Sequence, residues 1–500
     1  MKYWLGLDVG TGGSRALLVD SGGRPRHAFT AAHEEMRMAR PLWAEQDPDD
    51  WWRASKEAIV GVLKSAGAAG SDVAGIGLSG QMHGLVLLDE RRRVIRPALI
   101  WCDQRSQRQV DSINVKLGRE AVVACIANPM LTGFTLPKLL WVREQEPEQF
   151  ARVRKILLPK DYARFRLTGE FATDVSDASG TGLFDVVKRD WSERMTSSLG
   201  LDSGILPRAR ESSEISGAIS ERAAQETGLA AGTPVVAGAG DQAASAIGNG
   251  IVRPGMVSCT IGTSGVVFAY LEQPAYDPAG RVHTFCHAIP GAWHVMGVTQ
   301  GAGLSLQWFR SRLAREASYD DLTREAADSP EGAHGLFWLP YLMGERTPHL
   351  DANARGAWIG LTAKHERKDL ARAILEGVCY SQKDGLEIIA SLGAQPSSVR
   401  LSGGGAKSAF WHQLFADIFG RRVATLETQE GSAYGAALLA TIGTGEYANA
   451  AEVCGRALKE AASKEPCEAA AGRYRKRYEV YGSLYPALRA AFRSISELDE

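Results

Sequence analysis

YWLGLDVGTGGSRALLVD, residues 3–20, is the stretch that decides the fold. An apolar run, a break rich in glycine and a second apolar run are typical of a strand, a tight turn and a strand. MVSCTIGTSGVVFAY at 256–270 has the same pattern, and its IGTSG segment resembles VGTGG at 9–13. A second match follows in the same order, because IGLSG at 76–80 resembles VRLSGGG at 399–405. Ordered matches of this kind predict two similarly built halves.

The length of the chain agrees with this division. Its 500 residues exceed one ordinary domain, since domains usually hold roughly 100–200 residues. We therefore expect a boundary near residue 250, with domains at 1–250 and 251–500.

Other segments predict the elements around these turns. In DPDDWWRASKEAIVGVLKSAG a helix begins with Asp47 as N-cap and Pro48 at the first helical position. Residues 73–89 predict a strand, a glycine turn and a strand, while 233–248 and 398–420 predict a strand, a glycine turn and a helix. The last 50 residues are charged and rich in alanine, which predicts helices covering a surface.

Charge and hydropathy exclude several kinds of partner. Lys and Arg total 57 against 58 Asp and Glu, and this net charge of −1 provides no basic surface for nucleic acid or an anionic membrane. The amino terminus reaches Asp8 too early for a signal-peptide core, and no uncharged run is long enough to cross a bilayer. We therefore expect a cytoplasmic protein that binds neither nucleic acid nor membrane.

Glycine is the one departure in composition. The chain has 54 glycines among 500 residues, where about 7% is usual. Many of them fall in a few short windows at the ends of predicted strands. Because glycine lets the backbone approach a ligand closely, we interpret the excess as bare backbone facing bound ligands.

The turn from Gly10 to Arg15 could hold phosphate. A glycine-rich turn exposes backbone N–H groups, which are the donors that phosphate oxygens need. Thr11 adds a hydroxyl, Arg15 adds a cation if it points inward, and Asp8 could hold a hydrated Mg²⁺ beside the phosphates. An ordinary hairpin explains one such loop more simply, but the second copy at 261–265 favours two phosphate loops, one in each half.

Two common nucleotide signatures do not apply. The pattern G-x-x-x-x-G-K-[ST] does not occur in the sequence. GAGDQA at 238–243 fits G-x-G-x-x-A, but no acid follows at the required distance, and Asp241 would stand where a pyrophosphate should sit. A dinucleotide site is therefore disfavoured.

Asp241 could serve in either of two roles, and the residues alone do not decide between them. At a helix start its carboxylate could accept the proton of a hydroxyl. The depressed pKa expected there would make it a weak base, which phosphoryl transfer tolerates. As an N-cap it would only complete the helix.

Four potential metal ligands lie close together in HTFCHAIPGAWHVMGV, at 283–298: His283, Cys286, His287 and His294. The stretch reads as two strands joined by a Pro-Gly turn, and alternation would place those side chains on both faces. We favour a structural role for them.

The chain as a whole resembles the FGGY family of carbohydrate kinases, within the sugar kinase/actin/Hsp70 superfamily. The resemblance extends over nearly the whole sequence, and the motifs occur in the order of the family. They are GLDVGTGGSR (6–15), PLWAEQDPDDWW (41–52), GLSGQMHGLVLLD (77–89), LIWCDQRS (99–106), LPKDYARFRLTGEFATDVSDASGTGLFD (158–185), GAGDQAASAIG (238–248), TIGTSGVVF (260–268), HTFCHAIPGAWHVMGV (283–298), LPYLMGERTPH (339–349) and LSGGGAKSAFW (401–411).

This resemblance implies an α/β fold, with two ribonuclease-H-like domains around a central cleft. ATP is expected mainly against the C-terminal half and the sugar mainly against the N-terminal half. Asp241 would be the base, and Asp8 would help to place Mg²⁺ and the γ-phosphate. The residues expected at ATP are Thr11, Gly12, Gly13, Arg15, Gly262, Thr263, Gly404 and Gly405.

The resemblance also implies a substrate. Met82-His83-Gly84 matches the segment that contacts a ketopentose in part of the family, so we expect phosphorylation of D-xylulose at its 5-hydroxyl. The expected sugar-binding residues are Met82, His83, Gln242 and Asp103. Ribulose, fuculose or ribitol are alternative substrates, and a non-enzymatic nucleotide switch is an alternative function. A homodimer is what the family suggests.

Overall fold

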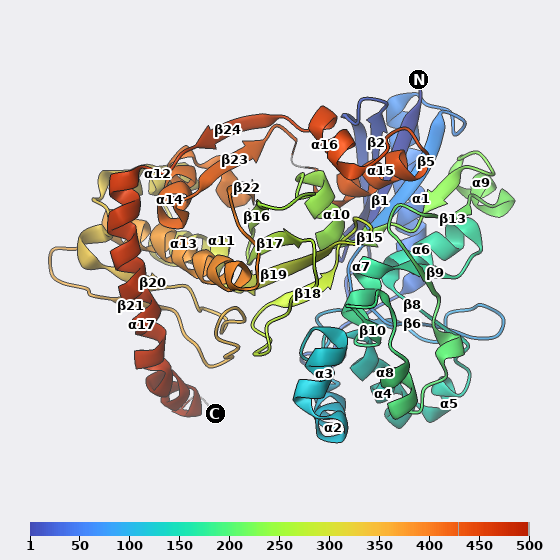
Figure 1. The fold of residues 1–500 in the computed structure, drawn as a ribbon, viewed down its shortest axis with the longest axis horizontal. Helices are drawn as coiled ribbons and strands as arrows, with labels where there is room; N and C mark the ends of the chain where they lie inside the picture. Colours follow the sequence, from blue (N-terminus) through green and yellow to red (C-terminus); the bar gives the residue numbers. More distant parts are fainter. Residues whose placement is uncertain (429, 499–500) are drawn as a thin grey trace.

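The computed structural model describes residues 1–428 and 430–498, and two seven-stranded sheets form its framework (Figure 1). The first sheet has the order β13-β14-β5-β1-β2-β3, and β15 also pairs with β5. Its strands are β1 (Tyr3–Val9), β2 (Gly13–Asp20), β3 (Pro25–Ala32), β5 (Val73–Gly80), β13 (Ile215–Ala218), β14 (Pro234–Val236) and β15 (Ala239–Gly240).

The second sheet has the order β18-β19-β17-β16-β22-β23-β24. All of its strands come from the second half of the chain. They are β16 (Met256–Ile261), β17 (Gly265–Leu271), β18 (His283–Cys286), β19 (Trp293–Thr299), β22 (Ser398–Gly403), β23 (Arg422–Leu426) and β24 (Glu460–Lys464).

The two sheets share one connectivity. In the first, β1 pairs antiparallel with β2 and parallel with β5, and β2 pairs antiparallel with β3. In the second, β16 pairs antiparallel with β17 and parallel with β22, and β17 pairs antiparallel with β19. The internal repeat predicted from the glycine turns is therefore confirmed, and the expected α/β class with two similar domains is correct. A boundary near residue 250 stays our proposal.

Helices cover both sheets. The longer ones are α1 (Pro48–Ala66), α2 (Gln107–Leu117), α3 (Arg119–Ile126), α4 (Thr135–Gln145), α6 (Pro159–Thr168), α10 (Asp241–Gly248), α11 (Ala302–Leu313), α12 (Tyr319–Asp328), α13 (Arg367–Ser391), α14 (Ala409–Phe419), α15 (Gly431–Gly443), α16 (Ala450–Ala457) and α17 (Glu468–Leu498). Short helices are α5 (Pro147–Phe150), α7 (Val175–Ala178), α8 (Glu193–Ser198) and α9 (Glu221–Thr227), and the 3₁₀ turns lie at 179–181, 203–205, 333–335 and 404–407. None of the helices described is long and apolar enough to cross a membrane.

Helix α1 begins as its sequence predicts. The Asp47 carboxylate accepts a hydrogen bond from the Asp49 N–H at 2.9 Å, and Pro48 is the first helical residue. The helix buries Trp51 and Trp52 beside the first sheet and ends at Gly67, which has φ 60°. An N-cap, a proline at the first position and a glycine in the left-handed region are the signals that fix both ends.

Glycine has a structural role that the sequence interpretation missed. A Cβ on Gly435 in α15 would lie 1.7 Å from the Ala244 carbonyl oxygen of α10, and one on Gly77 in β5 would lie 2.0 Å from the Ala436 oxygen. Helix α15 therefore packs directly on the backbone of α10 and of the first sheet. Our interpretation that the glycine excess faces ligands is wrong for these positions, because here backbone meets backbone.

The strand, turn and strand predicted for 73–89 are present as β5 and β6 (Val86–Leu88), and β6 pairs with β8 (Lys155–Leu157). The prediction for the end of the chain was wrong in part. The last 50 residues are helical in α16 and α17, but β24 between them is an edge strand on β23. Its sequence, EAASK, has no apolar alternation, and pairing with β23 overrides the helical preference of its alanines.

The remaining strands form short two-stranded sheets: β4 (Glu45–Gln46) with β7 (Ala98–Leu99), β9 (Ala172–Asp174) with β12 (Arg208–Arg210), β10 (Phe184–Asp185) with β11 (Asp190–Trp191), and β20 (Phe337–Leu339) with β21 (Ala357–Ile359). One hydrophobic cluster joins the two halves, because Met82 and Ala246 pack in it together with Phe268 and Met296 of the second sheet.

Candidate active site

The register of the first sheet brings two carboxylates to one edge. Asp8 in β1 lies opposite Ser79 in β5, and Ser79 lies opposite Ala239 in β15. Asp241 follows β15 directly, as the first residue of α10. The Ser79 hydroxyl donates to Asp8 Oδ1 at 2.6 Å. Because the carboxyl ends of parallel strands meet at one edge, residues far apart in the sequence share this site.

Asp241 is not the N-cap of its helix. Gly240 occupies that position, and Asp241 lies in the first turn with its side chain half-buried. Burial and the charge of Asp8 raise the pKa of Asp241 from 3.8 to about 7. Our expectation of a depressed pKa was wrong, because desolvation and a second carboxylate outweigh the helix N-terminus here. A carboxylate with a pKa near neutrality is a better general base than the sequence suggested.

The surroundings of Asp8 fit a divalent cation. Burial raises the pKa of Asp8, while Ser79, Ser432 and Arg15 act in the opposite direction. The negative charges of two neighbouring carboxylates repel one another, and a bound cation would reduce that repulsion. The described residues contain no group of three or more His, Cys, Asp or Glu able to hold a metal alone. Mg²⁺ commonly binds one or two carboxylates together with phosphates and water, and Asp8 is the carboxylate that we expect to hold it.

Two buried side-chain amides donate hydrogen bonds to carbonyls of the first glycine loop. Gly10 N–H donates to the Gly13 carbonyl at 3.0 Å and closes the turn. The Gln46 amide donates to the Thr11 carbonyl at 2.8 Å, and the Gln81 amide donates to the Gly10 carbonyl at 3.3 Å. With these carbonyls engaged by protein, the exposed turn at Gly12 is left open toward solvent. Gln46 and Gln81 are site residues that sequence reasoning missed, although both lie within the family motifs at 41–52 and 77–89.

The second glycine loop is exposed and rests on α11. Gly262 and Thr263 are exposed, and their carbonyls accept hydrogen bonds from the N–H groups of Gly303 and Leu304 at 2.8 and 3.0 Å. These are first-turn amides of α11, so the helix fixes the loop.

Gly404 and Gly405 lie in the 3₁₀ turn that follows β22. Gly404 is exposed, and a Cβ on Gly405 would lie 2.5 Å from Ile261 Cγ2. Since Ile261 ends β16 just before Gly262, the two glycine segments border one another.

His83 is held in an unusual conformation. Its φ is 69°, in the left-handed region that non-glycine residues seldom adopt, and such strain concentrates at functional sites. His83 Nδ1 lies 2.7 Å from the Gly180 carbonyl oxygen, and burial lowers the pKa of His83 to about 3. The ring is therefore neutral, with its proton on Nδ1 because a carbonyl only accepts, and Nε2 is an acceptor.

Met82 and Gln242 flank Asp241. Met82 is buried, and a Cβ on Gly240 would lie 2.9 Å from its Sδ, so the thioether lies against the residue that precedes Asp241. Gln242 is half-buried in the first turn of α10 and adds hydrogen bonds to the Asp241 carboxylate. The structure thus brings Met82 and Gln242, two of the residues expected at the sugar, to the expected base.

Asp103 and Arg15 are engaged with protein groups. The Asp103 carboxylate is 0% exposed, accepts from Ala44 N–H at 2.7 Å and pairs with Arg105 at 2.7 Å. A carboxylate committed in this way supports its own loop, and a contact between Asp103 and the sugar stays a prediction. Arg15 forms an ion pair with Glu430 and donates to Thr30 at 3.1 Å, which ties the first loop to the second half.

The prediction for 283–298 is correct only in part, because the three histidines lie together around Phe285 and only Cys286 points to the other face. His294 stacks on Phe268 with ring centroids 4.3 Å apart, and His287 lies edge-on to His294 at 5.7 Å. Cys286 instead donates to the Val186 carbonyl at 3.4 Å. His283 reaches toward the first half, because its Nδ1 lies 3.3 Å from Asn128 Oδ1.

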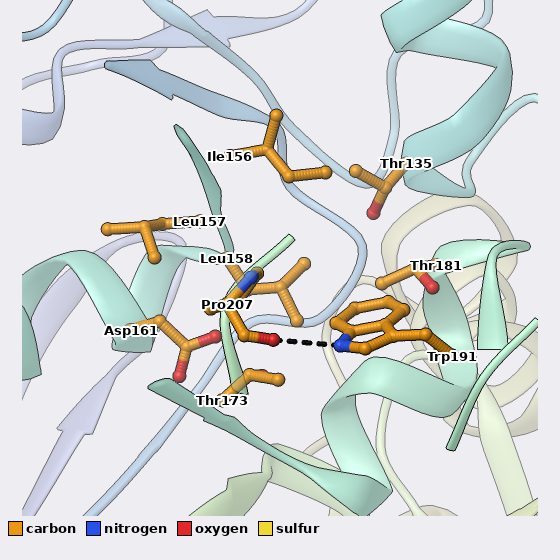
Figure 2. Close-up of a pocket in the computed structure, with 9 residues that line it drawn as sticks. All are labelled: Thr135, Ile156, Leu157, Leu158, Asp161, Thr173, Thr181, Trp191 and Pro207. Carbon is orange, nitrogen blue, oxygen red and sulfur yellow. Dashed lines mark hydrogen bonds between the residues drawn. The ribbon is translucent and has the colours of Figure 1, made fainter. Parts of the chain in front are cut away.

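A small cavity lies beside α6 and next to Thr135, whose hydroxyl donates to the His83 carbonyl at 3.1 Å (Figure 2). Its volume is about 10 Å³, at the lower limit for a single water molecule, so it cannot hold a sugar or a nucleotide. Its lining includes Asp161, Thr173 and Trp191, and the indole N–H donates to the Pro207 carbonyl at 2.8 Å.

Family models match both halves of the chain. The N-terminal domain of the FGGY family of carbohydrate kinases matches residues 3–248, and the C-terminal domain of the same family matches residues 257–444. These two matches identify the duplicated α/β fold as that of a carbohydrate kinase.

Xylulose kinases are similar to this chain over almost its full length. A xylulose kinase of Escherichia coli strain K12 is 41% identical over 490 residues, covering 97% of this chain and 99% of that protein. A xylulose kinase of Bacillus subtilis strain 168 is 40% identical over 485 residues, covering 97% of both. The crystal structure of a xyloylose kinase from Brucella ovis has a TM-score of 0.92 and 39% identity, covering 98% of this chain and 100% of that one.

The chain belongs to the FGGY family of carbohydrate kinases. It is therefore a phosphotransferase with an alcohol group as acceptor, and the family implies ATP as the phosphate donor. The family assignment from the sequence motifs is confirmed, and it favours an enzyme over a non-enzymatic nucleotide switch.

Proposed function

We propose that the protein transfers the γ-phosphate of ATP to the 5-hydroxyl of D-xylulose, giving D-xylulose 5-phosphate and ADP. The observation that carries this proposal is the packing of Met82, the first residue of the Met82-His83-Gly84 segment, against Gly240, the residue before Asp241. The names of the Escherichia coli and Bacillus subtilis relatives and of the Brucella ovis structure point to the same sugar.

Asp241 is the base in this proposal. Its carboxylate takes the proton of the sugar hydroxyl as the oxygen attacks the γ-phosphorus, and the bond to the β-phosphate oxygen breaks. Phosphoryl transfer depends mainly on positioning and on charge stabilisation, so a base with a pKa of about 7 is sufficient. His83 accepts a hydrogen bond from a sugar hydroxyl at Nε2, and Met82 forms an adaptable apolar wall.

The two loops bind phosphate from opposite halves. Thr11, Gly12 and Gly13 present backbone N–H groups from the first half, and Gly262 and Thr263 do so from the second. Gly404 and Gly405 border the adenosine beside Ile261. Asp8 would hold Mg²⁺ directly or through water, and the bound ion would supply neutralisation of phosphate charge.

A panel of sugars tests the substrate. ADP release is measured with purified enzyme, ATP and Mg²⁺ on D-xylulose, D-ribulose, L-fuculose, ribitol and glycerol, and the sugars are ranked by kcat/KM. We expect D-xylulose to lead by at least about 10²-fold, because a site built to bond particular hydroxyls rejects analogues that leave its polar groups unpaired. Turnover on another sugar but not on D-xylulose would reassign the substrate within the family.

A homodimer and a cytoplasmic location stay predictions.

A further inference from the structure

The stretch LPKDYARFRLTGEFATDVSDASG, at 158–180, contributes five charged side chains to a fully buried cluster. Lys160 at the start of α6 lies 2.7 Å from Asp161, 2.8 Å from Asp174 and 3.2 Å from Asp177. All four side chains are 0% exposed, and Arg164 adds a second cation at 3.7 Å from Asp161. None of these residues takes part in the proposed phosphoryl transfer.

A buried cluster of this kind stabilises a fold less well than apolar residues would. Moving charges out of water usually costs more free energy than their mutual attraction recovers. A buried ion cluster is therefore weak evidence for a stabilising role. In some proteins, buried polar groups serve instead to fix one conformation. The backbone that this cluster contacts is therefore the place where its effect should be seen.

The cluster lies directly behind the edge that carries the two candidate carboxylates. A Cβ on Gly80, at the end of β5, would lie 3.1 Å from Lys160 Cβ. Gly80 is the register partner of Gly240 in β15, and Gly240 immediately precedes Asp241. Lys160 thus packs against the same row of backbone from which Asp241 projects.

One chain of hydrogen bonds joins the cluster to that backbone. The Gly240 N–H donates to Ser176 Oγ at 3.1 Å, and the Ser176 hydroxyl donates to Asp174 Oδ2 at 2.5 Å. Asp174 is the residue that Lys160 holds by its other oxygen. Gly240 has no side chain through which the protein could hold it, and α10 has no side-chain cap. Its N–H is therefore a point at which the protein can fix this peptide.

We propose that Ser176, oriented by Asp174 and Lys160, is a positioning residue that fixes the Gly240 peptide and thereby aims the Asp241 carboxylate at the sugar hydroxyl. The proposal rests on the proposed role of Asp241 as the base. Loss of the hydroxyl leaves the buried Gly240 N–H without its acceptor, so the peptide can rotate. A displacement of about 1 Å at a reacting group can cost on the order of 10²-fold in rate.

Ser212 supplies a matched control. It is buried to the same 0% as Ser176, and its hydroxyl donates to the same oxygen, Asp174 Oδ2, at 3.2 Å. Its hydroxyl does not bond to Gly240 N–H, which donates to Ser176. Ser176→Ala and Ser212→Ala therefore remove the same group from the same carboxylate, and only the first releases the Ala239–Gly240 peptide.

The experiment compares full-length wild type, Ser176→Ala and Ser212→Ala with the best sugar of the panel. For Ser176→Ala we expect kcat to fall by about 10- to 100-fold, while KM for ATP and for the sugar stay within about twofold. For Ser212→Ala we expect kcat within about twofold of wild type. Melting temperatures of both variants are measured in parallel, so that unfolding is distinguished from a misoriented Asp241 carboxylate.

Ser176→Thr is the second variant, because it keeps the hydroxyl and adds a methyl group to a buried site. We expect it to melt earlier than Ser176→Ala, since overpacking destabilises a core, and yet to keep most of kcat. Wild-type kcat in Ser176→Ala, equal losses in both alanine variants, or a slow Ser176→Thr that melts like wild type would each overturn the proposal. Failure of the proposed substrate is seen separately, as a wild-type enzyme that prefers another sugar.

Discussion

At the scale of single residues, Asp241 combines a chemical role with a cost to stability. Its pKa rises from 3.8 to about 7, which means that the charged carboxylate is disfavoured in the folded protein. We predict that Asp241→Asn lowers kcat by at least about 10²-fold, because the base is lost, and raises the melting temperature. Steady-state kinetics and calorimetry on the same preparation measure both effects.

The gain in stability should depend on pH with a definite sign. A carboxyl whose folded pKa is raised holds its proton longer in the folded state, so its contribution to stability declines as pH rises from about 4 to about 7. Asparagine does not titrate. The difference in melting temperature between Asp241→Asn and wild type should therefore be small near pH 4 and largest above about pH 7. A difference that shrinks as pH rises would contradict the raised pKa.

Asp384 is the control for this prediction. Burial also raises its pKa to about 7, but it lies in α13, where its carboxylate accepts from the Tyr478 hydroxyl at 2.7 Å. Asp384→Asn should show a similar rise in melting temperature with pH and an unchanged kcat. Equal loss of activity in both variants would mean that kcat follows stability and not the base.

At the scale of elements, the packing of α15 on α10 determines where Asp241 stands. A Cβ on Gly435 would lie 1.7 Å from the Ala244 carbonyl oxygen and 2.6 Å from its carbon, and backbone atoms cannot move aside as a side chain can. We predict that Gly435→Ala forces the two helices apart, lowers the unfolding free energy by about 3 kcal/mol or more and reduces kcat. Chemical denaturation and kinetics measure the two losses.

Gly455 shows what the same substitution does without a neighbour. It lies exposed within α16, has no atom within 4 Å of the added Cβ and is not in the left-handed region. Gly455→Ala should stabilise the protein by about 0.5–1 kcal/mol, because alanine loses less backbone entropy in a helix. A destabilised Gly455→Ala would show that helix glycines matter here for a reason other than close packing.

These elements also show which features of the structure could be predicted from the sequence. The turns at 10–12 and 262–264 were predictable, because apolar runs on both sides fix a strand pair locally. The pairing of β6 with β8 was not, since register between distant segments leaves no local signal. Nor could the sequence separate glycines that face ligands from Gly77 and Gly435, which face another backbone. The raised pKa of Asp241 was missed because its causes, burial and the charge of Asp8, arise from segments that are distant in the sequence.

At the scale of the whole molecule, the proposed site is built from both halves, so we expect them to close on the substrates. Asp8 and Asp241 belong to the first half, while Gly262 and Gly404 follow strands of the second sheet. Contacts between the halves near the site include polar ones, such as the ion pair between Arg15 and Glu430, and exposed ion pairs are worth only about 0–1 kcal/mol. The hydrophobic cluster that contains Met82 and Phe268 also joins the halves, so opening costs more than this ion pair, and we expect ligand binding to supply the energy that closes the site.

Small-angle scattering tests this closure. A compact chain of 500 residues has a radius of gyration of about 23 Å, and we expect a measurable decrease with D-xylulose and a non-hydrolysable ATP analogue together. Either ligand alone should produce less of it, because each contacts mainly one half. Closure should also make ATP hydrolysis without sugar much slower than phosphorylation, since water enters an open site that is not assembled for transfer. An unchanged radius together with slow hydrolysis would mean that the two halves are already fixed at their working distance, and that specificity against water resides in Met82 and His83 alone.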